Sequence, residues 1–186
     1  MKPLCNLILF VTLNAAIVNT QAADANVMAR LQALEDKESI RTLLFDYGRY
    51  LDARDWDSFA ALFAENGGTW NGGMGVAKGR AAIKKMMIDT IGGTNVGANG
   101  SGQSNLHLLG NDIIEVKGDT GTALSKWAFV MTDKVQGPTI MYIGHYQDTF
   151  VREKGQWKFK ERVAFADITR PGPLPALEEK KPDAKK

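Results

Sequence analysis

The sequence predicts an α+β domain, in which helices cover one face of a curled antiparallel sheet. Two observations lead to this prediction. From about Asn26 to Ala53, apolar residues recur at spacings of three, four and seven, which is the period of an amphipathic helix. After Ser104 the period becomes two, through four long segments separated by glycine-containing turns. Helices followed by long antiparallel strands pack in two layers, and a cavity can form between them.

The first 22 residues have the features of a secretory signal peptide. Lys2 supplies a short positive region, Leu4–Val18 is mostly apolar, and small residues surround Ala22. A membrane anchor is the alternative, but an apolar run of about 15 residues is shorter than the roughly 20 that span a bilayer. We therefore expect an exported protein, periplasmic or secreted, that has no membrane association after cleavage and whose domain spans residues 23–170.

Composition restricts the chemistry and the partners of the mature chain. Cys5 is the only cysteine and lies inside the predicted signal, so the exported protein would have neither a disulfide nor a thiol nucleophile. Without Lys2, 22 basic residues face 21 acidic ones. Such a near-neutral chain has no electrostatic footprint for nucleic acid or for an anionic membrane surface. The balance favours a small, largely uncharged ligand.

The helical part begins with the amphipathic segment at residues 26–53, which could break near Asp36. Its apolar stripe comprises Leu31, Leu34, Ile40, Leu43, Leu44, Tyr47 and Leu51. A shorter helix follows, for which Asp55 is a good N-cap, and Gly67-Gly68 ends it.

The segment between the second helix and the period-two region contains three further features. Thr69–Val76, which holds Trp70, reads as an edge strand or a hairpin, and a third helix runs from about Gly79 to Ile91. Gly92–Gln103 has five glycines among small polar residues and is predicted to be a mobile loop. This loop either covers a pocket or simply joins a helix to the sheet. At the other end of the chain, proline and mixed charges predict a disordered tail at residues 171–186.

The four predicted strands are separated by turn sequences. They are Leu106–Val116, Thr120–Lys134, Thr139–Glu153 and Gln156–Ile168. Two of them approach 15 residues, and neighbouring antiparallel strands of that length must twist and coil.

Residue parity assigns the large aromatic side chains of the second and third strands to one face each. These faces carry Ala123, Ser125, Trp127, Phe129 and Met131, and Tyr142, Gly144, Tyr146, Asp148 and Phe150. We assign both to the interior, where aromatic walls with a few polar groups would line a cavity. A completely filled core is the alternative.

The two histidines, His107 and His145, are the natural candidates for proton transfer near neutral pH. His107 lies among apolar residues at the start of a strand, where a carboxylate partner would make it a general acid or base; otherwise it is simply packed. His145 has the opposite parity to Tyr146. The chain has neither His-Glu-x-x-His nor Cys-x-x-Cys, and its glycine-rich loop lacks the phosphate-binding Gly-Lys-Ser/Thr ending, so we expect no metal and no cofactor.

Four segments together resemble a known family. They are Tyr47-Gly-Arg-Tyr-Leu-Asp52-Ala-Arg-Asp55-Trp56 with the following Phe59-Ala-Ala-Leu-Phe63, then Leu106-His107-Leu-Leu-Gly-Asn111, Gly144-His-Tyr146-Gln-Asp148 and Gly155-Gln-Trp157-Lys-Phe159. Over about Leu31–Asp167 the chain resembles a SnoaL-like domain of the nuclear transport factor 2 (NTF2-like) superfamily. This resemblance implies a cone, in which a strongly curved sheet wraps around helices and encloses a pocket. Members of the family include dehydratases, isomerases, cyclases and proteins without known catalysis.

Within the family the chain is similar to scytalone dehydratase and bile acid 7α-dehydratase. That similarity implies catalytic roles for Tyr47, Asp52 and His107. The pattern is incomplete, because Leu51 replaces a tyrosine of the former enzyme and Met131 falls near a polar residue of the latter. Five residues also correspond to about 140° around a helix, so Tyr47 and Asp52 can share a pocket only if the helix ends or turns near Leu51.

The resemblance and the residue pattern lead to one functional expectation and one rival. We expect a cofactor-free dehydratase or isomerase that acts on a small cyclic apolar molecule. Asp52 would hold His107 in one tautomer, and Tyr47 would hydrogen-bond a substrate oxygen. Predicted ligand-binding residues are Trp70, Trp127, Phe129 and Tyr146. The rival is a non-catalytic binding module of the same fold, and a homodimer, common in the superfamily, is compatible with both.

Overall fold

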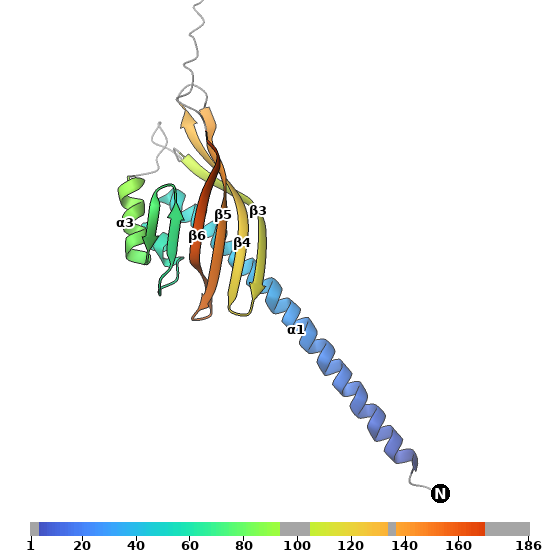
Figure 1. The fold of residues 1–186 in the computed structure, drawn as a ribbon. Coiled ribbons are helices and arrows are strands. Elements are labelled where there is room, and N and C mark those ends of the chain that lie inside the picture. The colour runs from blue at the N-terminus through green and yellow to red at the C-terminus, as the bar shows by residue number, and fades with distance from the viewer. Residues whose placement is uncertain (1–3, 94–104, 134–136, 170–186) are drawn as a thin grey trace, which may run out of the picture.

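The computed structural model describes residues 4–93, 105–133 and 137–169, with side chains from Asp24 onward (Figure 1). Its elements are α1 (Leu4–Ala53), α2 (Trp56–Ala61), β1 (Thr69–Gly72), β2 (Gly75–Lys78), α3 (Arg80–Thr90), β3 (Asn105–Lys117), β4 (Thr120–Asp133), β5 (Gly137–Glu153) and β6 (Gln156–Thr169). The predicted α+β class, the hairpin and the four long strands are confirmed. The predicted loop at Gly92–Gln103 and the predicted tail lie largely or wholly outside the described residues.

The six strands form one sheet in the order β2-β1-β6-β5-β4-β3. All neighbours are antiparallel except β1 and β6, which run parallel with Trp70 opposite Arg162. The expectation of a purely antiparallel sheet is therefore wrong at this position. The reason lies just before β1, where Phe63 already forms a parallel bridge to Phe159 and the Ala64 N–H donates to the Phe159 carbonyl. Strand β1 follows this bridge along the chain and therefore runs parallel to β6.

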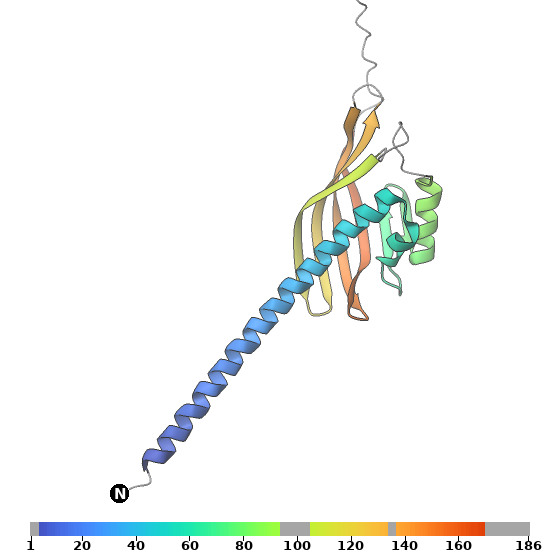
Figure 2. The same ribbon diagram turned by 180° about the vertical axis from the view of Figure 1, so that it is seen from behind.

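Helix α1 crosses one face of the sheet and extends well beyond it toward its N-terminus, as the two opposite views show (Figures 1 and 2). It is continuous through Asp36, so the break considered there does not occur, and it begins well before the expected Asn26. Leu31 and Leu34 of the predicted stripe are exposed, at 44% and 65%, because they precede the sheet. Among the described residues, no helix is both long and apolar enough to cross a membrane. The signal peptide stays a prediction.

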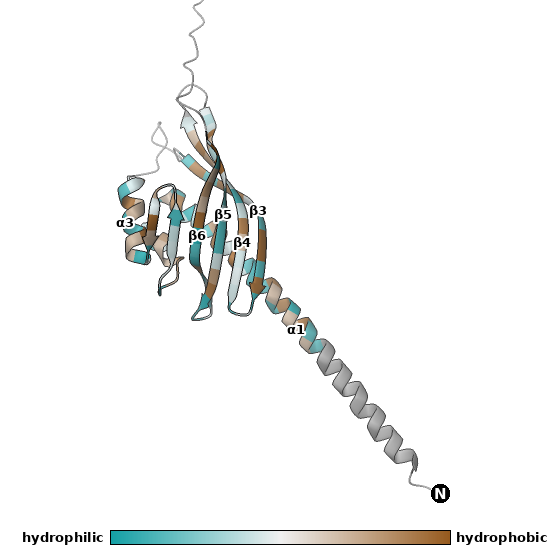
Figure 3. Ribbon diagram, viewed as in Figure 1, coloured by the Kyte–Doolittle hydropathy of each residue, from teal (hydrophilic) through white to brown (hydrophobic). Residues whose placement is uncertain are grey.

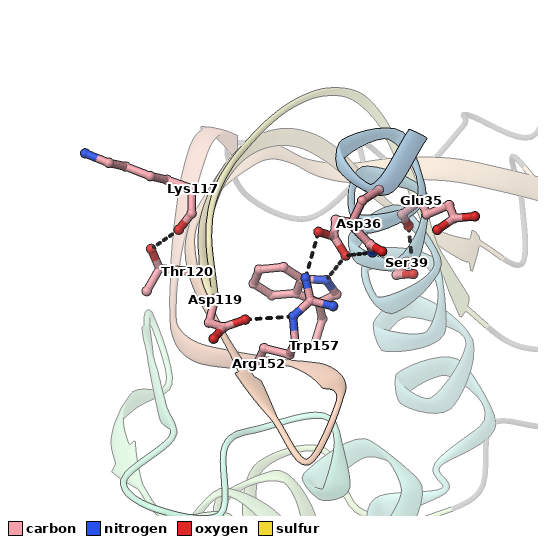
Figure 4. Close-up of polar contacts among 9 residues, drawn as sticks. Glu35, Asp36, Ser39, Lys117, Asp119, Thr120, Arg152 and Trp157 are labelled. Atoms are coloured by element: carbon pink, nitrogen blue, oxygen red, sulfur yellow. Dashed lines mark hydrogen bonds and ion pairs between the residues drawn. The ribbon is translucent and has the colours of Figure 1, made fainter. Parts of the chain in front are cut away.

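An ionic cluster around Asp36 fastens α1 to the ends of the strands (Figure 4). The Asp36 carboxylate accepts hydrogen bonds from Trp157 Nε1 at 3.2 Å and lies 2.7 Å from Arg152 Nη2. Arg152 also pairs with Asp119 in the β3–β4 turn. Burial by itself raises the pKa of Asp36, but the hydrogen bonds, led by that of Arg152, outweigh it and hold the pKa below its ordinary value. These contacts keep Asp36 helical, where the sequence suggested a break.

We expect Asp36→Asn to lower the free energy of unfolding near neutral pH by about 1.5–3 kcal/mol, the range for hydrogen bonds to charged groups. Because the folded-state pKa of Asp36 is lowered, its contribution is complete above the unfolded pKa and is lost as the pH falls below about 4. Urea denaturation from pH 7 to pH 3 should therefore show a shallower acid loss in the variant. Glu38→Gln, at an exposed pair on α1, serves as the control; an equal effect there would contradict the assignment.

Apolar and polar residues are mixed along the long strands (Figure 3), as expected for strands with one covered face. The interior faces predicted for β4 and β5 are confirmed at Ala123, Ser125, Gly144, Tyr146, Asp148 and Phe150, which are buried. Met131 and Tyr142, at the far end of these strands, are 38% and 41% exposed. One half of the sheet therefore covers a filled aromatic core, and the other half opens into a cavity.

Candidate functional site

A partly enclosed cavity of about 430 Å³ lies between the C-terminal end of α1, the β1–β2 hairpin and the strands β3–β6. Its lining is mainly aromatic and consists of Tyr47, Leu51, Arg54, Trp70, Gly73, Met74, Ile91, His107, Trp127, Phe129, Tyr142, Tyr146, Ala164 and Ala166. All four predicted ligand-binding residues line it, together with Tyr47 and His107. Asp52 does not line the cavity and lies behind His107.

Asp52 and His107 form a close pair between α1 and β3. The Asp52 Oδ1 atom lies 2.7 Å from His107 Nδ1, and Oδ2 accepts the His107 backbone N–H at 2.8 Å. Both side chains are largely buried, with 11% and 13% of their surface exposed. One carboxylate thus fixes both the backbone and the ring of the histidine.

This pairing determines which nitrogen of His107 is available. A carboxylate accepts hydrogen bonds, so Nδ1 carries the proton and Nε2 of the neutral ring keeps its lone pair. The ring also packs against Phe129, with centroids 4.8 Å apart. Together Asp52 and Phe129 give His107 a defined orientation in the cavity wall, as a general base requires.

Tyr47 reaches the same cavity from a different side of α1. Its ring is 2% exposed and packs on Phe59, and its hydroxyl accepts a hydrogen bond from Trp70 Nε1 at 2.9 Å. Burial raises the pKa of Tyr47. Burial also raises the pKa of Tyr146, and the nearby Tyr47 raises it further. Both phenols therefore stay protonated and act as hydrogen-bonding groups rather than as bases. Because α1 continues through Asp52 to Ala53, Tyr47 and Asp52 lie on different sides of the helix. Tyr47 therefore lines the cavity directly, while Asp52 contacts His107 from behind.

Arg54 lines the cavity as well, and the sequence reasoning assigned it no role at the site. It follows the end of α1 with a φ of 59°, and the Asp55 N–H bonds the Tyr50 carbonyl while the Arg54 N–H bonds that of Leu51. This is the hydrogen-bond pattern of a Schellman helix end, whose left-handed position usually holds glycine. Arg54 stands directly before the N-cap Asp55, at a position where glycine would be favourable. An arginine at this position is the sequence signal that could have pointed to it.

Trp127 forms the floor of the cavity because Gly144 leaves room for its ring. A Cβ at Gly144 would lie 2.6 Å from the Trp127 ring and 1.9 Å from the Phe165 carbonyl oxygen. The indole stacks on Tyr146, with centroids 5.6 Å apart. Its Nε1 is buried and has no hydrogen-bond partner within the described part of the chain. A bound ligand with an acceptor atom would satisfy this donor.

His145, the other histidine, lies away from the cavity and pairs with Asp167 at 2.8 Å while stacking on Phe165. A groove of about 850 Å³ between α1, α2 and the β5–β6 turn is larger than the cavity but more open, and its Asp36 and Arg152 are already paired with each other. We therefore take the smaller, aromatic cavity as the site. The residues with described side chains contain no group of three or more His, Cys, Asp or Glu placed to hold a metal ion.

The sequence profile of the SnoaL-like domain family matches residues 32–163. An uncharacterised protein of Mycobacterium tuberculosis is 27% identical over 138 residues, which cover 73% of this chain and 88% of that protein. The solved structure of an NTF2-like protein with a cystatin-like fold from Novosphingobium aromaticivorans has a TM-score of 0.64 at 28% identity, covering 76% and 88% of the two chains.

Two further solved structures are also similar. A protein of Novosphingobium aromaticivorans that is provisionally assigned as a scytalone dehydratase has a TM-score of 0.60 and 28% identity, with 76% and 90% of the chains covered. A hexachlorocyclohexane dehydrochlorinase, LinA-type3, from Novosphingobium barchaimii has a TM-score of 0.62 at 17% identity, covering 79% and 95%, which shows a shared fold alone.

Proposed function

Because this chain belongs to the SnoaL-like domain family and has its NTF2-like fold, we propose that it is a cofactor-free lyase or isomerase that transfers protons on a small cyclic, largely apolar molecule. The observation that supports this most is the Asp52–His107 pair in the wall of an aromatic cavity. The neighbours of this fold include a protein assigned as a dehydratase and a dehydrochlorinase. A signal peptide would place the reaction outside the cytoplasm.

The proposed reaction begins with His107 Nε2 removing a proton from a carbon next to a substrate carbonyl. The electron pair of the broken C–H bond moves into the ring system, and the carbonyl oxygen becomes an enolate. Asp52 stabilises the imidazolium that forms, because its carboxylate lies 2.7 Å from Nδ1. The aromatic walls would hold the ring of the substrate and exclude water.

Two outcomes follow from the enolate. In an isomerisation, His107 returns the proton to another carbon of the conjugated system, so that only a double bond has moved. In a dehydration, the enolate expels a hydroxyl group from the β-carbon, and this group takes the proton from His107 and leaves as water. Both outcomes return the carbonyl and the neutral histidine, and neither needs a redox partner.

The rival function is a binding module in which Asp52 only fastens β3 to α1. The two contacts of its carboxylate with His107 favour this rival too, because they would stabilise the fold without any catalysis. The two functions differ in what the loss of the charge should do to turnover.

We expect Asp52→Asn to lower kcat by roughly 10²-fold or more while leaving ligand affinity nearly unchanged. The amide cannot stabilise the histidine cation, and its NH₂ group can hold the ring in the wrong tautomer. The measurement is steady-state kinetics on a panel of β-hydroxy cyclic ketones, followed by the absorbance of the conjugated enone. Asp167→Asn, which removes the same charge beside His145 outside the cavity, is the matched control. Equal rates in wild type and Asp52→Asn would favour the binding module.

A further inference from the structure

We propose that Arg54 is an anion-binding residue of the cavity and that the substrate is a ring compound whose oxygen is, or becomes, negatively charged. This inference deepens the proposed function and relies on it for the orientation of the substrate. The preference for a charged oxygen does not depend on catalysis.

The first argument is the charge of Arg54 in its surroundings. Besides His107, it is the only side chain with an ionisable basic group in the described cavity lining, which is otherwise aromatic or apolar apart from the tyrosine hydroxyls. Burial lowers the pKa of Arg54, and the charge of Asp52 opposes this effect. A partly buried cation is costly unless negative groups compensate for its burial. The charge of Asp52 compensates only in part, since burial still outweighs it. An anionic ligand oxygen would supply further compensation.

The hydrogen bonds of Arg54 leave capacity for a ligand. Its Nη1 donates to the Leu51 carbonyl at 2.7 Å and its Nη2 to Asn105 Oδ1 at 3.1 Å, and both acceptors are neutral. Its Nε is buried and has no partner in the described parts of the chain. A guanidinium has five N–H donors, so these two bonds orient the group without exhausting it.

The backbone supplies an independent argument. With a φ of 59°, Arg54 occupies a left-handed position that favours glycine, and most other residues there cost roughly 1–2 kcal/mol. Strain of this kind persists only where the surrounding structure maintains it, and such residues cluster at ligand sites. The conformation of Arg54 in the cavity lining therefore supports a functional role for its side chain.

The position of Arg54 beside His107 defines the class of substrate. Asp52 contacts His107, and Arg54, two residues after Asp52, contacts Asn105, two residues before His107. Two residue pairs thus join the end of α1 to the start of β3. A carbonyl oxygen bound by Arg54 would hold the adjacent C–H bonds near His107. When the proton leaves, Arg54 would stabilise the enolate oxygen, which makes it a candidate catalytic residue.

The test uses 4-nitrophenol as the probe, because its ionised form resembles an enolate on a ring and alone absorbs visible light. Binding is titrated across neutral pH with wild type, Arg54→Met and Arg54→Gly. The quantity compared is the affinity for the phenolate divided by the affinity for the phenol. We expect this ratio to be at least about tenfold higher in wild type than in either variant, as a charge-assisted hydrogen bond implies. Arg54→Gly suits the left-handed backbone, so it keeps the test valid if Arg54→Met does not fold.

A control variant separates this inference from a general effect of charge. Arg49→Gln removes a cation that pairs with Asp46 on the helix surface, and it should keep the wild-type preference. Equal preferences in wild type and the Arg54 variants, or no saturable binding of the probe, would overturn the anion site. A wild-type protein that prefers the phenolate but turns over no β-hydroxy cyclic ketone would refute the proposed catalysis and leave the anion site standing.

Discussion

Replacing Asp148 with alanine should lower the free energy of unfolding by about 3–5 kcal/mol, the effect typical of breaking a buried ion pair. Asp148 and Arg162 form two hydrogen bonds of 2.8 and 2.7 Å, and both side chains are fully buried. The guanidinium lies over the rings of Tyr47 and Tyr146, 3.9 Å from each centroid. The variant would leave this cation buried without its partner. Guanidinium chloride denaturation followed by circular dichroism measures the change.

Two comparisons show whether the loss comes from the unpaired cation. Asp148→Leu combined with Arg162→Met removes both charges, so the double variant should be more stable than Asp148→Ala alone. Asp89→Ala, at an exposed pair with Lys85 on α3, should change stability little. If Asp148→Ala unfolded at the same denaturant concentration as wild type, the ion pair would not organise the core.

The largest effect on activity is expected for His107→Gln, which should lower kcat by about 10²–10⁴-fold, the usual contribution of a general base. Glutamine is close in size and can still hydrogen-bond Asp52, but it cannot take up a proton. The β-hydroxy cyclic ketone assay described above measures the loss, and thermal unfolding confirms that the variant folds.

His145→Gln is the matched control, because His145 also pairs with an aspartate at 2.8 Å but lies on the opposite face of β5 from Tyr146. Its turnover should equal that of wild type. If both histidine variants lost activity equally, a general effect on the sheet would explain the loss. If neither did, His107 would not be the base.

Local patterns predicted the elements and the covered faces well. Asp55 caps α2 by accepting the Ser58 N–H at 3.1 Å, as its position before Trp56 indicated. The alternation in β4 and β5 placed Trp127 and Tyr146 correctly on the inner face. These features depend on neighbours in sequence, so the sequence carries them directly.

Features that depend on strand register were not predictable. Asp148 was assigned to the interior, but its partner Arg162 was not recognised. A shift in the β5–β6 register between Thr149 and Phe150 places both Phe159 and Arg162 on the inner face, which breaks the alternation along β6. The bond from Trp70 to Tyr47 likewise depends on the parallel pairing of β1 with β6.

The candidate site was predictable in part, through the resemblance rather than the pattern alone. The pairing of Asp52 with His107 followed from the family motifs, since 55 residues of chain separate the two. Arg54 was missed because its place in the cavity lining depends on the left-handed backbone turn that ends α1. Arginine at such a position carries no periodic signal.

Exchange of hydrogen for deuterium tests most directly whether this protein removes protons from a bound ring compound. Wild-type protein is incubated with 2-tetralone in D₂O, and the loss of proton signals beside the carbonyl is followed by NMR, while quenching of tryptophan fluorescence reports binding. We predict exchange at these carbons that is faster than in buffer and saturates with binding. Saturable binding of 2-tetralone with exchange no faster than in buffer would contradict the account.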